Sequence, residues 1–85
     1  MTAQEHRRAA HAAQAAEDQQ LLITVAWCIG QGLRDLQSTR KTPRLVGCRK
    51  MLIGTLRRQH GWTMRRCAER LGWQIARVKR ISAAK

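Results

Sequence analysis

Residues 63–83 read TMRRCAERLGWQIARVKRISA, and this stretch decides the fold because apolar residues recur at helical spacing on both sides of one glycine. The inward positions predicted before the glycine are Met64, Cys67, Ala68 and Leu71, and those predicted after it are Ile75, Val78, Ile81 and Ser82. Thr63 is a good N-cap for the first segment, and Gly72 can take the positive φ that a short turn requires. The pattern predicts two helices, about 64–71 and 74–83.

A second helix start lies upstream at Thr42 and Pro43, because Thr is a good N-cap and Pro suits the first helical position. We predict a helix from about residue 43 to 60, followed by Gly61 in the left-handed conformation. Its inward stripe is predicted at Leu45, Cys48, Leu52 and Leu56, widened by Val46, Met51 and Ile53. Arg49 and Lys50 are assigned in part to the solvated outer face.

The N-terminal part is predicted to be helical as well. Residues 3–20 are rich in Ala, Gln, Glu and Arg, which are good helix formers, so they indicate a solvated helical extension or a frayed arm. Apolar spacing predicts a helix over roughly 20–37, in which Gly30 and Gly32 allow a close backbone approach or mark a bend; a local strand over 22–29 is the weaker alternative. The expected fold is therefore all-α, with an N-terminal arm and dimerisation segment (1–41) before a three-helix domain (42–85).

The charge is concentrated in the second part of the chain. The 85 residues carry a formal net charge of +12, and nearly all of the excess cations follow residue 39. Such a field indicates a polyanionic partner: DNA, RNA or an acidic membrane. No apolar run approaches the roughly 20 residues that a membrane-spanning helix needs, and the N-terminus does not read as a secretory signal. We therefore expect a cytoplasmic protein that does not enter a membrane.

Residues 64–83 resemble the helix-turn-helix of bacterial and phage DNA-binding regulators. The matching positions are the small Ala68 in the first helix, Leu71 and Gly72 at the turn, Trp73 after it, and Val78 and Ile81 in the second helix. Trp73 is larger than the aliphatic residue usual there, and Ile75 is apolar where the family has a polar, base-reaching residue. A looser similarity links residues 49–83 to the DNA-binding domains of bacterial replication initiators, whose signature loop is absent, and to Mu-like phage middle regulators.

The resemblance implies that the helix 74–83 reads the major groove of double-stranded DNA, as in a sequence-specific transcriptional regulator; the size and composition fit a phage or mobile element. The predicted base-reading residues are Gln74, Ala76 and Arg80. The predicted phosphate contacts are Thr63, Arg65, Arg66, Arg77, Lys79, Arg57 and Arg58. Arg65 and Arg66 lie in a first helical turn, where the helix dipole disfavours cations and where a phosphate would be held; simple solvation of exposed arginines is the alternative.

One unit of this kind reads few base pairs, so such modules usually act as two-fold dimers. The apolar stripe of the N-terminal part exceeds what this short chain can easily cover. We therefore predict that the stripe packs on the C-terminal part and also forms a homodimer contact. The residues assigned to that contact are Leu22, Val25, Ile29, Leu33 and Leu36.

Other chemistry finds no support in the sequence. The acidic residues are isolated and expected to be exposed, so no enzyme is predicted, and no cofactor, metal or small-molecule ligand is expected. Cys28, Cys48 and Cys67 lack paired spacing and are predicted to be buried thiols. Trp27, Trp62 and Trp73 are predicted core anchors, and His60 a helix-end residue. Two alternatives to sequence-specific DNA binding stay open: non-specific RNA or DNA binding in an architectural role, and docking on an acidic host protein.

Overall fold

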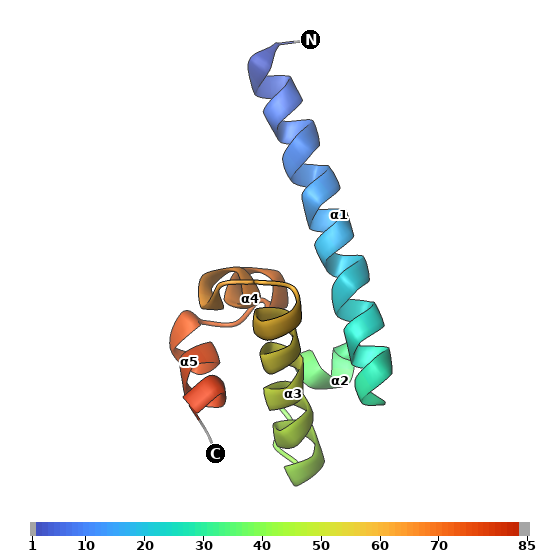
Figure 1. Ribbon diagram of the computed structural model, residues 1–85, viewed down its shortest axis with the longest axis vertical. Helices are drawn as coiled ribbons and strands as arrows, with labels where there is room; N and C mark the ends of the chain where they lie inside the picture. Colours follow the sequence, from blue (N-terminus) through green and yellow to red (C-terminus); the bar gives the residue numbers. More distant parts are fainter. Residues whose placement is uncertain (1, 84–85) are drawn as a thin grey trace.

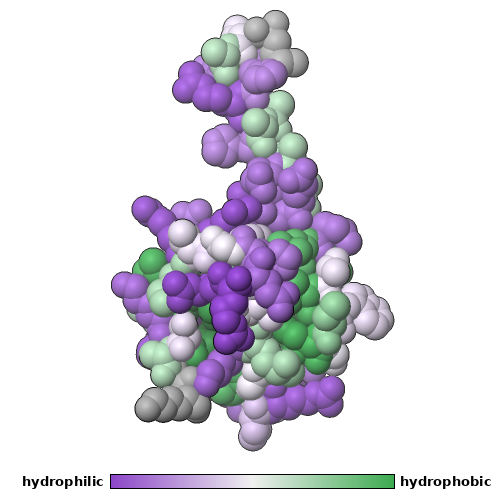
Figure 2. All heavy atoms as spheres, in the orientation of Figure 1, coloured by the Kyte–Doolittle hydropathy of each residue, from purple (hydrophilic) through white to green (hydrophobic). Residues whose placement is uncertain are grey.

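The computed structural model describes residues 2–83, which form five α-helices and no strand (Figure 1). The helices are α1 (Ala3–Ile29), α2 (Leu33–Gln37), α3 (Pro43–Gln59), α4 (Met64–Leu71) and α5 (Ile75–Ala83). α4 crosses one end of α3, α5 lies alongside α3, and the N-terminal half of α1 projects beyond the rest (Figure 2). The molecule measures 49 × 24 × 24 Å. The all-α prediction is confirmed. None of the helices in residues 2–83 is long and apolar enough to cross a membrane.

Helix ends follow the local capping signals of the sequence. The hydroxyl of Thr42 accepts the N–H of Leu45 at 3.2 Å, and the hydroxyl of Thr63 accepts the N–H of Arg66 at 3.1 Å. Gly72 ends α4 with φ of 73°, in the left-handed region that favours glycine. The predicted starts of α3 and α4 and the turn before α5 are therefore confirmed, as is His60 at the end of α3.

The single helix predicted over residues 20–37 is wrong in its middle. α1 runs without a break from Ala3 to Ile29, which confirms that the N-terminal extension is helical. Gly30 then takes φ of 87°, and its N–H bonds back to the carbonyl of Ala26. This left-handed cap stops α1, so the chain reverses and α2 starts again at Leu33. The glycines thus mark a complete turn rather than a kink.

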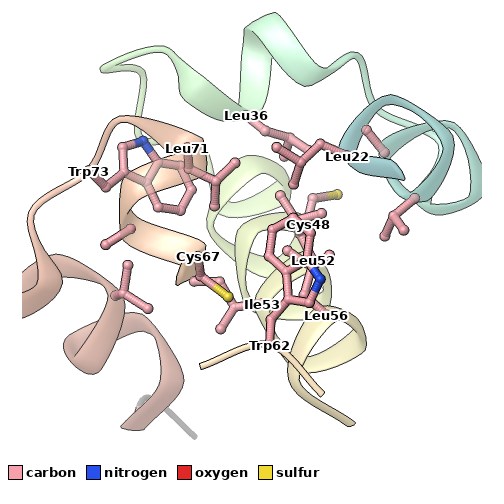
Figure 3. Packing of buried hydrophobic residues seen from close by; sticks show 14 of the residues in the cluster. Leu22, Leu36, Cys48, Leu52, Ile53, Leu56, Trp62, Cys67, Leu71 and Trp73 are labelled. Carbon is pink, nitrogen blue, oxygen red and sulfur yellow. The ribbon is translucent and has the colours of Figure 1, made fainter. Parts of the chain in front are cut away.

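The core is one continuous apolar cluster that all five helices share (Figure 3). Leu22 and Leu36 enter it from the N-terminal part, Leu52 and Leu56 from α3, and Val78 from α5. Each of these leucines, and Val78, is completely buried. Burying one such side chain stabilises the fold by roughly 1.5–3 kcal/mol relative to leaving it exposed. Within the described residues, the N-terminal part (2–41) therefore packs on the C-terminal part (42–83), as the apolar stripe predicted.

Several predicted core residues lie outside this cluster. Trp27 is 79% exposed and Cys28 is also exposed, because α1 turns the opposite face, with Leu22 and Val25, toward α3. On α3, Val46 and Met51 are 50% and 55% exposed, since they flank the stripe that contacts the other helices. Ile75 is exposed at the start of α5. Trp62, Trp73, Cys48 and Cys67 are buried as predicted.

Arg49 was assigned to the outer face of α3, and that assignment is wrong. Arg49 is only 3% exposed, and its guanidinium donates hydrogen bonds of 2.8 Å to the carbonyls of Leu36 and Ser38. These carbonyls lie at the C-terminal end of α2, where helical carbonyls lack partners within the helix. Arg49 therefore fastens the short α2 to α3.

Two glycine substitutions should change stability in opposite directions. Gly47 lies inside α3 with open space where a Cβ would stand, so Gly47→Ala should raise the free energy of unfolding by about 0.5–1 kcal/mol. Gly72 also has open space, but its positive φ makes Gly72→Ala cost about 1–2 kcal/mol. Urea denaturation followed by circular dichroism measures both. Equal effects of the two substitutions would contradict the left-handed turn between α4 and α5.

Candidate nucleic-acid interface

A buried carboxylate connects the projecting helix to the helix pair that carries the candidate site. Asp18 of α1 accepts a 2.7 Å hydrogen bond from Nη2 of Arg66 and another of 2.7 Å from Nε of Arg70, both from α4. Nε of Arg66 adds a longer contact of 3.3 Å, and Gln14 donates from within α1 at 3.0 Å. The Asp18 side chain is only 3% exposed. It therefore carries a charge in the interior that two arginines neutralise.

The surroundings of Asp18 favour its charged form. Burial raises the pKa of the Asp18 carboxyl, but hydrogen bonds from Arg66, Gln14 and Arg70 outweigh burial and hold the pKa below its ordinary value of 3.8. The Arg66 guanidinium also lies 4.6 Å from the centre of the Trp62 ring, which adds a cation–π contact. The carboxylate is thus ionised at neutral pH and binds α1 to α4.

This cluster differs from the sequence interpretation in two respects. Asp18 was expected to be exposed, and that is wrong. Arg66 was predicted to contact phosphate, whereas in the structure its guanidinium is engaged with Asp18. A sequence signal for the first point existed, because Asp18 precedes Leu22 by four positions and Val25 by seven, on the buried face of α1. The partners on α4 had no signal of this kind.

The α4–α5 pair forms a compact unit around the Gly72 turn. The N–H of Trp73 bonds to the carbonyl of Ala68 at 2.9 Å, and Ala68 itself is buried, as its small size predicted. The Arg77 guanidinium lies 4.6 Å from the centre of the Trp73 ring. At the end of α4, the amide of Gln37 donates to the carbonyl of Leu71 at 3.2 Å. These contacts hold α5 in place and leave its outer side free.

The residues predicted to read bases are all at the surface; Ala76 and Arg80 lie one turn apart on α5, and Gln74 directly precedes this helix. Gln74, Ala76 and Arg80 are all exposed, and the exposed Lys79 lies between the last two on α5. Among the described residues, neither Lys79 nor Arg80 forms an ion pair, and α5 carries no acidic side chain. We call these four residues the outer face of α5. It offers amide, ammonium and guanidinium donors to a ligand, and no acidic side chain on α5 pairs with them.

The residues predicted to contact phosphate are more scattered. Thr63 and Arg65 are exposed at the start of α4, and Arg65 forms a loose 3.5 Å ion pair with Glu69 on the same helix. Arg57 and Arg58 are exposed in the last turn of α3. Arg77 is half-buried because it lies over Trp73. Apart from Arg66, these side chains therefore remain accessible to a ligand.

The residues assigned to a dimer contact are mostly used inside the single chain. Leu22, Val25 and Leu36 are buried in the core, so a second copy has no access to them in this structure. Ile29 and Leu33 are half-buried and pack against the edge of the same core. The apolar surface that stays open in this region belongs to Ile23 and Trp27 instead.

Comparison with known proteins adds no relatives. No protein-family model matches the chain, and no match was found among curated proteins or solved structures. Within residues 2–83 no group of three His, Cys, Asp or Glu side chains is placed to hold a metal ion. Only the residues of this chain therefore support the candidate interface.

The buried carboxylate makes stability depend on pH in a defined way. Because folding lowers the pKa of Asp18, its contribution is fully present above the ordinary pKa of 3.8 and is lost as pH falls through the lower, folded value. At neutral pH, Asp18→Asn should lower the free energy of unfolding by about 1.5–3 kcal/mol. The difference between the variant and the unchanged protein should shrink below about pH 4.

Glu17→Gln is the matched control, since Glu17 is the exposed neighbour on the same helix and the charge change is identical. Chemical denaturation at a series of pH values measures all three proteins. If Glu17→Gln destabilises the protein as much as Asp18→Asn does, net charge rather than the Asp18 contacts explains the effect.

Proposed function

We propose that this chain is a small basic protein that binds double-stranded DNA through α4 and α5 and acts as a sequence-specific regulator. The observation that carries the proposal is the outer face of α5, where Gln74, Ala76, Lys79 and Arg80 are exposed together with no acidic neighbour on that helix. Nucleic-acid readers present basic and amide side chains from one helix in this way.

The dimensions of α5 suit the major groove. A helix with its side chains is about 10–12 Å across, and the major groove is about 12 Å wide, so α5 can lie in the groove along its nine residues. In this arrangement Arg80 donates to guanine, Gln74 pairs with adenine, and Ala76 packs against a thymine methyl group. The exposed Ile75 beside them adds an apolar contact rather than a hydrogen bond.

Phosphates are assigned to the side chains around that helix. The hydroxyl of Thr63 accepts from the backbone and keeps its own proton to donate to a phosphate. The Arg65–Glu69 pair is exposed and therefore weak, so Arg65 exchanges Glu69 for phosphate at little cost. Lys79, Arg77, Arg57 and Arg58 extend the positive field on either side. The Arg66 side chain is 38% exposed but already paired with Asp18, so its charge is only partly available to a phosphate.

The decisive measurement is selection of bound sites from random duplexes, followed by Arg80→Ala. We expect a defined preferred site, and loss of the Arg80 contact should cost about 1–3 kcal/mol on that site and relax one base position. Arg34→Ala is the control, because it removes the same charge from the exposed surface of α2, away from α5.

Two outcomes would contradict this function, and a third would contradict the role of Arg80 alone. If a random duplex binds as tightly as the selected one, an architectural role is favoured. Salt dependence cannot decide between the two, because it is steep for specific and non-specific binding alike. Tighter binding of RNA favours an RNA partner. An unchanged base preference in Arg80→Ala removes this residue as a reader.

We propose further that two copies associate through a hollow lined by Ile23, Trp27 and Leu33. None of the described residues that line it is charged, so the contact itself places no cation against a cation, although Arg44 reaches the carbonyl of Gly30 at its edge. A symmetric dimer places the same patch on both sides of the contact, and two half-sites need two reading helices.

Light scattering after size-exclusion chromatography tests the dimer at tens of micromolar. We expect a dimer mass that falls toward the monomer in Trp27→Ala. Met51→Ala, which shortens an equally apolar exposed side chain on α3, should leave the mass unchanged. A monomeric parent protein at that concentration would rule the dimer out.

A further inference from the structure

An open groove of about 870 Å³ lies between the start of α3 and the C-terminal half of α5. Its apolar surface comes from Pro43 and Val46 on α3 and from Ile81 on α5. Val46 is half exposed, and Gly47 beside it has no side chain to fill the space. The groove is therefore wide enough and apolar enough to hold a side chain from another molecule.

Cations surround this apolar surface. Lys41 precedes α3, Lys50 follows Val46 by one helical turn, and Arg77 and Arg80 approach from α5. No acidic residue is among the described residues that line the groove. The positive charges therefore line one groove, and none of the other described residues that line it is acidic and could neutralise them.

Arg49 lies deepest among these cations. It is buried, yet its hydrogen bonds go to backbone carbonyls, and no carboxylate within residues 2–83 pairs with it. Burial lowers the pKa of Arg49, and the nearby charge of Arg77 lowers it further. The guanidinium nonetheless stays charged at neutral pH, because arginine side chains remain protonated far above that pH. A buried charge of this kind is stabilised when an anion approaches it.

We infer that this groove binds an acidic peptide segment of another protein that carries an apolar side chain between its carboxylates. Carboxylates pair with guanidinium groups in a bidentate geometry, which Arg77 and Arg80 can offer. The apolar side chain packs between Val46 and Ile81. A nucleic-acid backbone would satisfy the cations but would place phosphates and sugars against this apolar wall, so the peptide fits the whole groove better.

The groove is a separate site from most of the outer face of α5. Gln74, Ala76 and Lys79 do not line it, whereas Arg77 and Arg80 line the groove and are also assigned to DNA contacts. Peptide and DNA would therefore compete for these two cations, but peptide binding does not require that DNA is read. The two can be separated by a substitution at Val46, which lies on α3 and has no part in the proposed DNA contacts.

The experiment measures fluorescence anisotropy of two labelled peptides with the full chain at physiological ionic strength. One peptide has two leucines between glutamates (EEEELLEEEE), and the other is all glutamate with the same eight side-chain carboxylates (EEEEEEEE). We expect the leucine peptide to bind about tenfold more tightly, because a buried leucine contributes at least 1.4 kcal/mol, the equivalent of one factor of ten.

Val46→Asn should abolish that preference and leave the weaker binding of the all-glutamate peptide intact. Met51→Asn is the matched control, since Met51 has similar exposure on the same helix but does not line the groove; it should keep the preference. Circular dichroism verifies that both variants remain folded.

Equal affinity for the two peptides, no binding of either, or equal effects of the two Asn substitutions would each overturn the proposal. A duplex whose affinity falls in Val46→Asn, while the leucine peptide binds that variant normally, would also overturn it and assign the groove to nucleic acid. Loss of DNA binding in Arg80→Ala alone leaves the peptide preference, and hence this inference, intact.

Discussion

The buried Asp18 carboxylate is the constraint on which the arrangement of this molecule depends. A chain with a net charge of +12 must bring many like charges close together when it folds. Asp18 offsets part of that repulsion, because its single negative charge lies between Arg66 and Arg70 and is paired with both from one buried position. The same contacts fix α1 against α4, so the long helix and the candidate site form one body. Gln14 and Trp62 complete the cluster from either side.

The arginines consequently divide into two groups with different roles. Arg49, Arg66 and Arg70 hold helices together through carbonyls or through Asp18, and their charge is only partly available to a partner. The exposed cations on α5, at the start of α4 and at the end of α3 are those that a polyanion can reach. The net charge of the sequence thus overstates the number of cations that a polyanion can reach. The useful quantity is the number of cations with no partner inside the chain.

Sequence reasoning worked best where one helical turn contains all the relevant groups. The starts of α3 and α4 were predicted because Thr42 and Thr63 cap backbone groups three residues away. Gly72 was predicted as a turn because only glycine adopts a positive φ at little cost. Reasoning failed at Gly30, since apolar spacing continues across it and conceals the break. It failed at Trp27, because periodicity shows that a helix has an apolar face without showing how much of that face a neighbour covers.

The sequence by itself determined an all-helical chain, the caps and turn of residues 42–83, and a strongly cationic C-terminal part. These follow from hydrogen bonds and spacing within a few residues. Only the tertiary structure decided which cations are free. Arg66 and Arg70 pair with a carboxylate 48 and 52 positions earlier in the chain, and Arg49 bonds to a carbonyl 13 positions earlier. Such partners meet only when the apolar core brings the helices together, so the local sequence pattern cannot predict them.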